Sequence, residues 1–146
     1  MEQQEMQGMM SSEKMIEMFT LKIISNLPIE SITKKVTDAC VEYKFSLLQT
    51  YIYQEILESK GFPIDRKVYI YEICQAKTAS LMLTSNPEFS LFMPCKLAIY
   101  EHEGKTVIST MNMGIMLDAV SSNKELYASA VSLFNTLQTL MNALAV

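Results

Sequence analysis

The stretch from residue 68 to residue 114 restricts the fold more than any other part of the chain. It begins with the sequence VYIYEIC at 68–74, whose composition and alternation predict a β-strand. Apolar residues at helical spacing follow at 75–85, and two further strands are predicted at 96–101 and 106–110. A strand, a helix, a return and a hairpin in this order are typical of an α+β domain with a mainly antiparallel sheet.

Turn-forming residues mark the ends of these elements. Asn86 and Pro87 end the helix, because proline cannot continue it and the residue before proline avoids helical backbone angles. Gly104 closes the sequence His-Glu-Gly, where a hairpin turn needs a positive φ. Residues 88–93 are expected to return to the sheet as an extended connection, and Pro94 then opens the next strand.

The rest of the chain supplies the packing around this stretch. A single domain is expected at 19–146, with five mainly antiparallel strands in the order βαββ(α)ββα. The remaining expected elements are strands at 19–25 and 45–53, a helix at 28–43, one or two helical turns at 54–60, and helical segments at 112–120 and 124–146.

The first eighteen residues are expected to form a weakly structured leader. They carry acidic residues where a signal peptide needs basic ones, which favours a cytoplasmic protein. Six of them are methionines, which can bind soft metals or partner helices, although a frayed terminal helix explains them more simply. The net charge of −4 and the lack of a basic run disfavour nucleic acid and anionic membranes as partners. No apolar run approaches the roughly 20 residues that span a bilayer.

The C-terminal helix carries an unusually wide apolar face. Leucines and an alanine recur at steps of four and three, and larger side chains widen the stripe on both sides. Such a face exceeds what one sheet needs, so it predicts a homodimer, with a sheet edge as the alternative contact surface. The stripe comprises Leu126, Ala130, Leu133, Leu137, Leu140 and Leu144, widened by Tyr127, Phe134 and Met141.

Three cysteines are the sharpest candidates for chemistry. Cys40 falls on the apolar stripe of its helix and is expected to be a core residue. Cys74 and Cys95 stand at the end of one strand and the start of the next, so they are expected within about 10 Å of each other if these strands are antiparallel neighbours. They are predicted to act as one exposed nucleophile and a resolving or packing partner; the alternative is that both are buried core residues.

Neighbouring groups are expected to modulate these thiols. The start of the helix near residue 75 would place a positive partial charge beside Cys74, and Lys96 follows Cys95. Both effects favour the thiolate, whereas Glu72 repels a thiolate at Cys74.

Other chemical sites receive less support from the sequence. Phosphate-binding and hydrolase motifs are absent, and His102 is expected to be a solvated turn residue. Zinc bound by Cys74, Cys95, Glu72 and His102 is allowed by ligand type, but the spacing fits no closed zinc motif. We therefore expect neither a metal nor a cofactor. Tyr51, Tyr69 and Tyr71 either line a ligand cavity or pack across strands.

Several short signatures resemble the domain-of-unknown-function 302 family, specifically its subgroup with EIC-Asn-Pro and Leu-Pro-Cys-Arg signatures. They are Tyr71-Glu72-Ile73-Cys74, Asn86-Pro87, Met93-Pro94-Cys95-Lys96, Tyr100-Glu101, Gly104-Lys105 and Met111-Asn112, and the similarity covers about 19–120. The chain departs from the subgroup at Gln75-Ala76, where Asn-Pro is frequent, and near Gln54, where many relatives carry histidine.

The resemblance implies a TATA-box-binding-protein-like fold, with helices on one face of an antiparallel sheet and often a homodimer. It does not imply DNA binding, because the fold name describes topology alone. Some members of the family look to be encoded beside sulfur-carrier and sulfur-oxidation proteins, so the resemblance also suggests thiol or persulfide handling.

Two functions remain open on this sequence. The first is a cytoplasmic thiol-based accessory protein that accepts or presents sulfane sulfur on a cysteine. The second is a non-catalytic dimeric binding module for a small apolar ligand or a partner protein. An accessible Cys74 or Cys95 favours the first function, and a closed apolar pocket with buried thiols favours the second.

Overall fold

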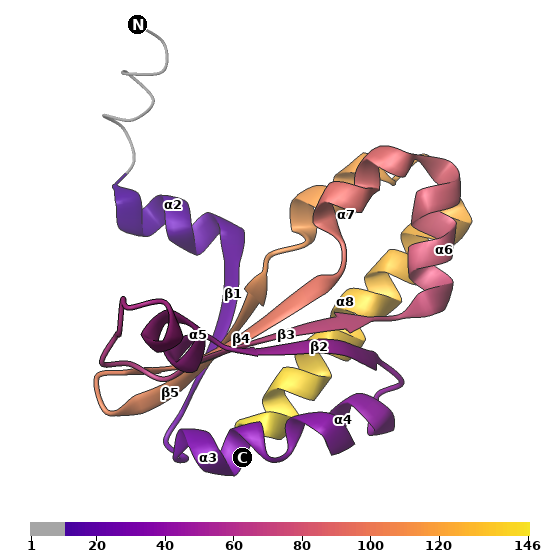
Figure 1. Ribbon diagram of the computed structural model, residues 1–146. Coiled ribbons are helices and arrows are strands. Elements are labelled where there is room, and N and C mark those ends of the chain that lie inside the picture. Colours follow the sequence, from indigo (N-terminus) through magenta and orange to yellow (C-terminus); the bar gives the residue numbers. More distant parts are fainter. Residues whose placement is uncertain (1–10) are drawn as a thin grey trace, which may run out of the picture.

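A computed structural model describes residues 11–146 of the chain. The elements form one sheet with helices on one side and a lobe beyond one end of its central strands (Figure 1). In chain order they are α2 (Ser12–Phe19), β1 (Thr20–Ser25), α3 (Ile29–Thr33), α4 (Val36–Glu42), β2 (Ser46–Ile52), α5 (Tyr53–Ser59), β3 (Val68–Cys74), α6 (Ala76–Ser85), the 3-10 helix η1 (Pro87–Phe92), β4 (Cys95–His102), β5 (Lys105–Met111), α7 (Gly114–Ala119) and α8 (Lys124–Leu144).

The sheet has five strands in the order β1-β5-β4-β3-β2, and every neighbouring pair is antiparallel. The expected α+β class and strand number are therefore confirmed. Glu103 and Gly104 both have positive φ in the turn between β4 and β5, as the predicted tight hairpin requires. Because β3 pairs directly with β4, the end of β3 and the start of β4 lie at the same end of the sheet.

The main core lies between one face of the sheet and the helices α3, α4 and α8. On the sheet side, Ile99 pairs with Ile108, and both side chains are fully buried. On the helix side, every residue of the expected α8 stripe is buried, and so is Met141. The wide apolar face of α8 is therefore covered within one chain, with Tyr127 remaining 41% exposed at its margin.

The opposite face of the sheet is open around Ile24, whose side chain is 60% exposed. Ile24 lines a shallow groove of about 400 Å³ together with Val68 and Tyr100. Apolar side chains on an open sheet face mark a surface that another molecule could cover.

The return from α6 to β4 differs from the expected extended connection. Residues Pro87–Phe92 form the 3-10 helix η1, in which the Asn86 Oδ1 accepts a hydrogen bond from the Glu88 backbone N–H at 2.9 Å. Proline is favourable at a first helical position because its φ is already set, and asparagine caps such a turn. The same Asn-Pro pair that ends α6 therefore begins a second helical segment.

The N-terminal half of the chain differs in two places. The helix expected at 28–43 is interrupted at Lys34 and Lys35, giving the separate helices α3 and α4. Part of the expected leader forms the helix α2, capped by Ser11, whose Oγ accepts a hydrogen bond from the Lys14 backbone N–H. The rest of the predicted leader, residues 1–10, lies outside the described residues. Among residues 11–146, none of the helices combines the length and apolar character needed to cross a membrane.

Candidate functional site

An apolar cavity of about 270 Å³ lies where the ends of β3 and β4 meet the lobe formed by α6, η1 and α7. Leu133 of α8 contributes to its inner wall. Its most unusual feature is the number of sulfur-containing residues that line it, which we call the sulfur pocket. They are Cys74, Met82, Met93, Cys95, Met113 and Met116.

The antiparallel register brings the two cysteines of the pocket together. Cys95 is the cross-strand partner of Ile73, and Cys74 is the next residue of β3. A cross-strand Cα separation of at most about 5.5 Å plus one residue step of about 3.8 Å places the two cysteine Cα atoms within about 9 Å. The predicted proximity is confirmed, and both thiols are free and partly buried.

Burial dominates the electrostatics of Cys95. Loss of solvation raises the pKa of this thiol to about 11, and the neighbouring Cys74 raises it further in the same direction. The expectation that Lys96 would favour a thiolate at Cys95 does not match this result. In the register Lys96 lies opposite Glu72, so the lysine and this carboxylate are cross-strand partners. Cys95 is therefore poorly suited to be the nucleophile at neutral pH.

Cys74 occupies the last position of β3, directly before the start of α6. Gln75 separates the two elements, and its Oε1 accepts a hydrogen bond of 2.7 Å from the Thr78 hydroxyl, which is buried. The helix begins where the sequence predicted it. Its favourable effect on a Cys74 thiolate stays a prediction, as does the opposing effect of Glu72.

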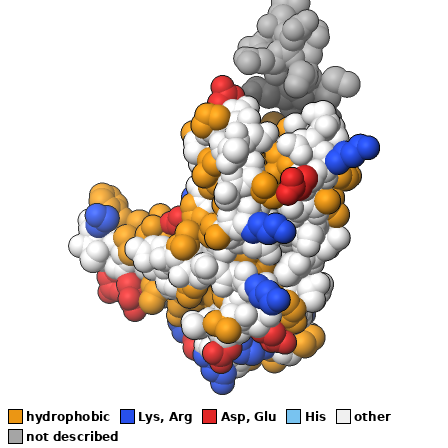
Figure 2. Space-filling view, turned by 90° about the vertical axis from the view of Figure 1, so that its right-hand side faces the viewer, with side chains coloured by type: hydrophobic (Ala, Val, Ile, Leu, Met, Phe, Trp, Pro, Cys, Tyr) orange, Lys and Arg blue, Asp and Glu red, His pale blue; other side chains and the backbone are white. Residues whose placement is uncertain are grey.

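The mouth of the sulfur pocket is surrounded by exposed hydrophobic side chains. Leu48 and Leu83 lie on its rim at 56% and 41% exposure, and Phe92 is 49% exposed. Phe92 also lines an adjoining cavity of about 160 Å³ with Leu91 and Met111. The surface on the lobe side of the molecule shows hydrophobic side chains among charged ones (Figure 2). The pocket is thus open to solvent through an apolar rim.

The four methionines of the pocket were not recognised from the sequence. They come from α6, from the residue after η1, and from the start of α7, so they are separated by up to 34 residues along the chain, from 82 to 116. Met93 lies inside the signature Met93-Pro94-Cys95-Lys96, in which Cys95 was the residue predicted to have a chemical role. No local sequence pattern identifies these methionines as pocket residues, because they meet only when the lobe folds back onto the ends of β3 and β4.

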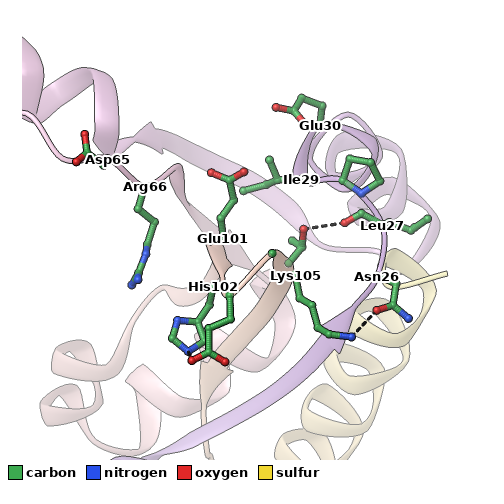
Figure 3. A pocket seen from close by; sticks show the side chains of 13 residues that line it. Asn26, Leu27, Ile29, Glu30, Asp65, Arg66, Glu101, His102 and Lys105 are labelled. Carbon is green, nitrogen blue, oxygen red and sulfur yellow. Dashed lines mark hydrogen bonds and ion pairs between the residues drawn. The ribbon is translucent and has the colours of Figure 1, made fainter.

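A second, polar cleft of about 470 Å³ lies at the other end of β4 (Figure 3). Two of the charged groups that line it have partners: the Lys105 ammonium donates a hydrogen bond of 2.7 Å to Asn26 Oδ1, and Glu30 pairs with Lys67. This ion pair lowers the pKa of the exposed Glu30 carboxyl. His102 is half exposed, as expected, and its Nε2 lies 3.7 Å from Glu103 Oε1. It is the last residue of β4, paired with Lys105, and does not lie in the turn as expected.

The alternative zinc site is not assembled. Cys95 and His102 occupy opposite ends of β4, and Glu72 lies opposite Lys96. Within residues 11–146, no group of three or more histidine, cysteine, aspartate and glutamate side chains is arranged to hold a metal ion.

The strand tyrosines serve packing. Tyr69 and Tyr71 stack with ring centroids 6.4 Å apart, and Tyr71 is buried in the core, where loss of solvation raises its pKa to about 12. Tyr51 lies in β2 across from Ile70, where the carboxylate of Glu72 raises its pKa. Tyr69 and Tyr71 are therefore packing residues, but their rings stack along one strand, β3, and not across strands as expected.

Comparison with known proteins identifies the family of the chain. No curated protein matches it. The crystal structure of an uncharacterized conserved protein DUF302 from Bacillus stearothermophilus is similar in fold, with a TM-score of 0.72 and 23% identity over 86% of this chain and 97% of that one. The family model "Domain of unknown function DUF302" matches residues 21–144. The chain therefore belongs to the DUF302 family.

Proposed function

We propose that this protein is a non-catalytic binding module that takes a small apolar molecule into the sulfur pocket. The observation that carries this proposal is a cavity of about 270 Å³ with a mainly apolar lining, bordered by exposed hydrophobic side chains. Its volume is close to the lower limit of ligand pockets, which is roughly 300 Å³. A ligand of a few carbon atoms or one aromatic ring would fit such a space.

The chemistry of the walls favours an apolar or aromatic ligand. Methionine side chains are flexible and polarizable, and their sulfur atoms make favourable contacts with aromatic rings. Met82 and Met116 are buried below the cavity, while Met93 and Met113 are partly buried. The adjacent high-pKa thiol of Cys95 behaves as a small uncharged group at neutral pH, so it does not oppose apolar binding.

Binding of indole, a small uncharged fluorescent probe with a single fused ring system, tests the proposal. The chain contains no tryptophan, so the fluorescence of the probe can be read without tryptophan emission. Ala79 lies in the pocket wall, and Ala79→Phe would fill part of the cavity. We expect the affinity for the probe to fall by about tenfold or more in this variant.

Ala128→Phe is the matched control, because Ala128 is exposed on α8. The control should bind the probe as the wild type does, with circular dichroism showing that both variants are folded. Equal affinity in the wild type and in Ala79→Phe would contradict binding in the sulfur pocket.

A second candidate function is sulfane-sulfur handling at Cys74, and the free, partly exposed thiol of Cys74 beside Cys95 favours it. In this reaction the Cys74 thiolate attacks the outer sulfur of a persulfide donor. A bond forms between Cys74 Sγ and that sulfur, the donor S–S bond breaks, and the donor leaves as a thiolate with the bonding electron pair. Sulfur-carrier proteins are the partners of this proposal, and a cytoplasmic location would keep the thiols reduced.

Intact-mass spectrometry after treatment with inorganic polysulfide tests this second function. Added sulfur atoms are expected on the wild type and on Cys95→Ser, and none on Cys74→Ser. A mass gain that persists in Cys74→Ser would show that another thiol reacts and would exclude the proposed role of Cys74.

A further inference from the structure

Six sulfur-containing side chains from separate parts of the chain line one cavity. The end of β3 provides Cys74 and the start of β4 provides Cys95, while α6, the end of η1 and the region of α7 provide the methionines. Both cysteines are free and both line the cavity, and the register places their Cα atoms within about 9 Å of each other. This arrangement is a cluster of soft ligands in a space that a small ion can enter.

The types of ligand select a class of metal. Thiolate and thioether sulfur are soft ligands that favour Cu(I), whereas carboxylate and water oxygen favour magnesium, calcium and manganese. None of the residues among 11–146 that line this cavity is a histidine, an aspartate or a glutamate. Zinc would lack the usual set of four cysteine, histidine or carboxylate ligands, because the cavity offers two cysteines.

The charge of the ion also matters in an apolar cavity. A monovalent cation and one thiolate form a neutral pair, which can be buried at a much lower free-energy cost than a separate charge. A second thiolate would leave one negative charge, and the start of α6 beside Cys74 would oppose it with its positive partial charge. Thioether ligands add no charge, so methionines can complete the coordination without further cost in charge burial.

We propose that the sulfur pocket is a binding site for one Cu(I) ion, held by Cys74 and Cys95 and completed by one or more of the pocket methionines. Each cysteine that binds the ion releases its thiol proton to solvent, and the ion stays Cu(I) throughout. This site does not rest on the proposed binding of an apolar molecule, although both would occupy the same cavity.

An anaerobic titration with Cu(I), in competition with the chromophoric chelator bathocuproine disulfonate, tests the proposal on the full chain. We expect one Cu(I) per chain, and a loss of affinity of about a hundredfold or more in Cys74→Ser and in Cys95→Ser, since serine oxygen is a poor ligand for this ion. The double variant Met82→Leu/Met116→Leu should lose about tenfold with little change in side-chain volume.

Two controls separate this site from other sulfur atoms of the chain. Cys40→Ala removes a thiol that is buried in the main core outside the pocket, and Met6→Leu/Met9→Leu/Met10→Leu removes methionines of the N-terminal segment. Both should bind Cu(I) as the wild type does. Because Cys40→Ala could unfold, the fold of every variant is checked by circular dichroism, and the N-terminal variant serves as an independent control.

Protection from alkylation provides a second measurement. Cu(I) at one equivalent should protect Cys74 and Cys95 of the folded wild type from iodoacetamide, as read by peptide mass spectrometry. Wild-type affinity in Cys95→Ser, or loss of binding only in the N-terminal methionine variant, would overturn the proposal.

Discussion

Cys95 lies at the first position of β4, and its backbone partner across the sheet is the fully buried Ile73. The pKa of its thiol is raised to about 11, mainly by burial and further by Cys74. A thiol with this pKa is almost entirely protonated at neutral pH, and the thiolate is the form that reacts. Cys74 is therefore the better candidate nucleophile of the pair, and Cys95 the better candidate for a packing or resolving role.

Alkylation of the three cysteines should follow this order. With iodoacetamide at pH 7.5, we expect Cys74 to react first, Cys95 to react much more slowly, and Cys40 to stay unmodified because it is 1% exposed. The rate at Cys95 should increase as the pH approaches 11. Peptide mass spectrometry over time measures all three rates, and a Cys95 that reacts faster than Cys74 at pH 7.5 would refute the assignment.

The raised pKa of Cys95 also predicts a dependence of stability on pH. The ordinary pKa of a cysteine thiol is 9.0, and that of Cys95 in the folded protein is about 11. Between pH 9 and pH 11 the folded protein keeps the Cys95 proton that the unfolded chain loses, so the free energy of unfolding falls as the pH rises. The contribution is present below pH 9 and amounts to roughly 3 kcal/mol. Denaturant unfolding of the wild type and Cys95→Ser measures it.

The comparison with Cys95→Ser is needed because the pKa of Tyr71 is also raised, to about 12. Its titration therefore also lowers the free energy of unfolding at alkaline pH, in both proteins. The difference between the two proteins should shrink from pH 9 to pH 11. A constant difference would mean that Cys95 is not protonated preferentially in the folded protein.

The lobe that closes the sulfur pocket depends on short elements with defined ends. α6 ends at Ser85, η1 starts at Pro87 after the single residue Asn86, and α8 starts after a turn that ends at Asn123. Met82, Met116, Val120, Leu126 and Ala130 form a small separate core that joins α6 and α7 to the start of α8. The cavity therefore lies between two cores and owes its shape to how the lobe packs on α8.

The cap of α8 can be tested directly. Asn123 Oδ1 accepts a hydrogen bond of 3.1 Å from the Leu126 backbone N–H, so Asn123→Ala leaves this N–H without its partner. We expect the free energy of unfolding to fall by about 1 kcal/mol. Ser122→Ala, at the exposed residue before the cap, is the matched control and should change little. Equal effects of the two substitutions would show that the cap does not stabilise α8.

At the scale of the whole molecule, the surface available to a second copy differs from the expected one. The apolar stripe of α8 is buried against its own sheet, so it leaves little area for a partner. The open sheet face around Ile24 and the helix α2, with Ile16 and Phe19 exposed by 60% and 54%, keep more apolar surface in solvent. The homodimer stays a prediction, and these surfaces now support it better than α8.

Sedimentation at micromolar concentration measures the oligomeric state. We expect the wild type to be a dimer and Ile24→Lys to shift it toward monomer, because a lysine cannot be buried without loss of its hydration. Val41→Lys is the control, since Val41 is 74% exposed on α4, away from this face. A monomeric wild type would refute the dimer, and equal effects of both variants would exclude the open sheet face as the interface.

Local residue patterns determined the elements of this protein to a large extent. β3 has the predicted bounds, the hairpin turn at Gly104 follows from its sequence, and the stripe of α8 was correct at every position. These features depend on the alternation of side chains, on the helical repeat and on turn residues, which act over a few positions. The proximity of Cys74 and Cys95 also followed, because it requires only that two strands be antiparallel neighbours.

The tertiary structure alone decided the environment of the pocket. Whether a thiol at a strand end is solvated or buried depends on the lobe that packs over it, so the high pKa of Cys95 could not be read from the adjacent Lys96. The four pocket methionines meet because the lobe folds back onto the sheet and α8. A methionine carries no local signal of its role, since the same side chain fills a core or faces a cavity according to what packs beside it.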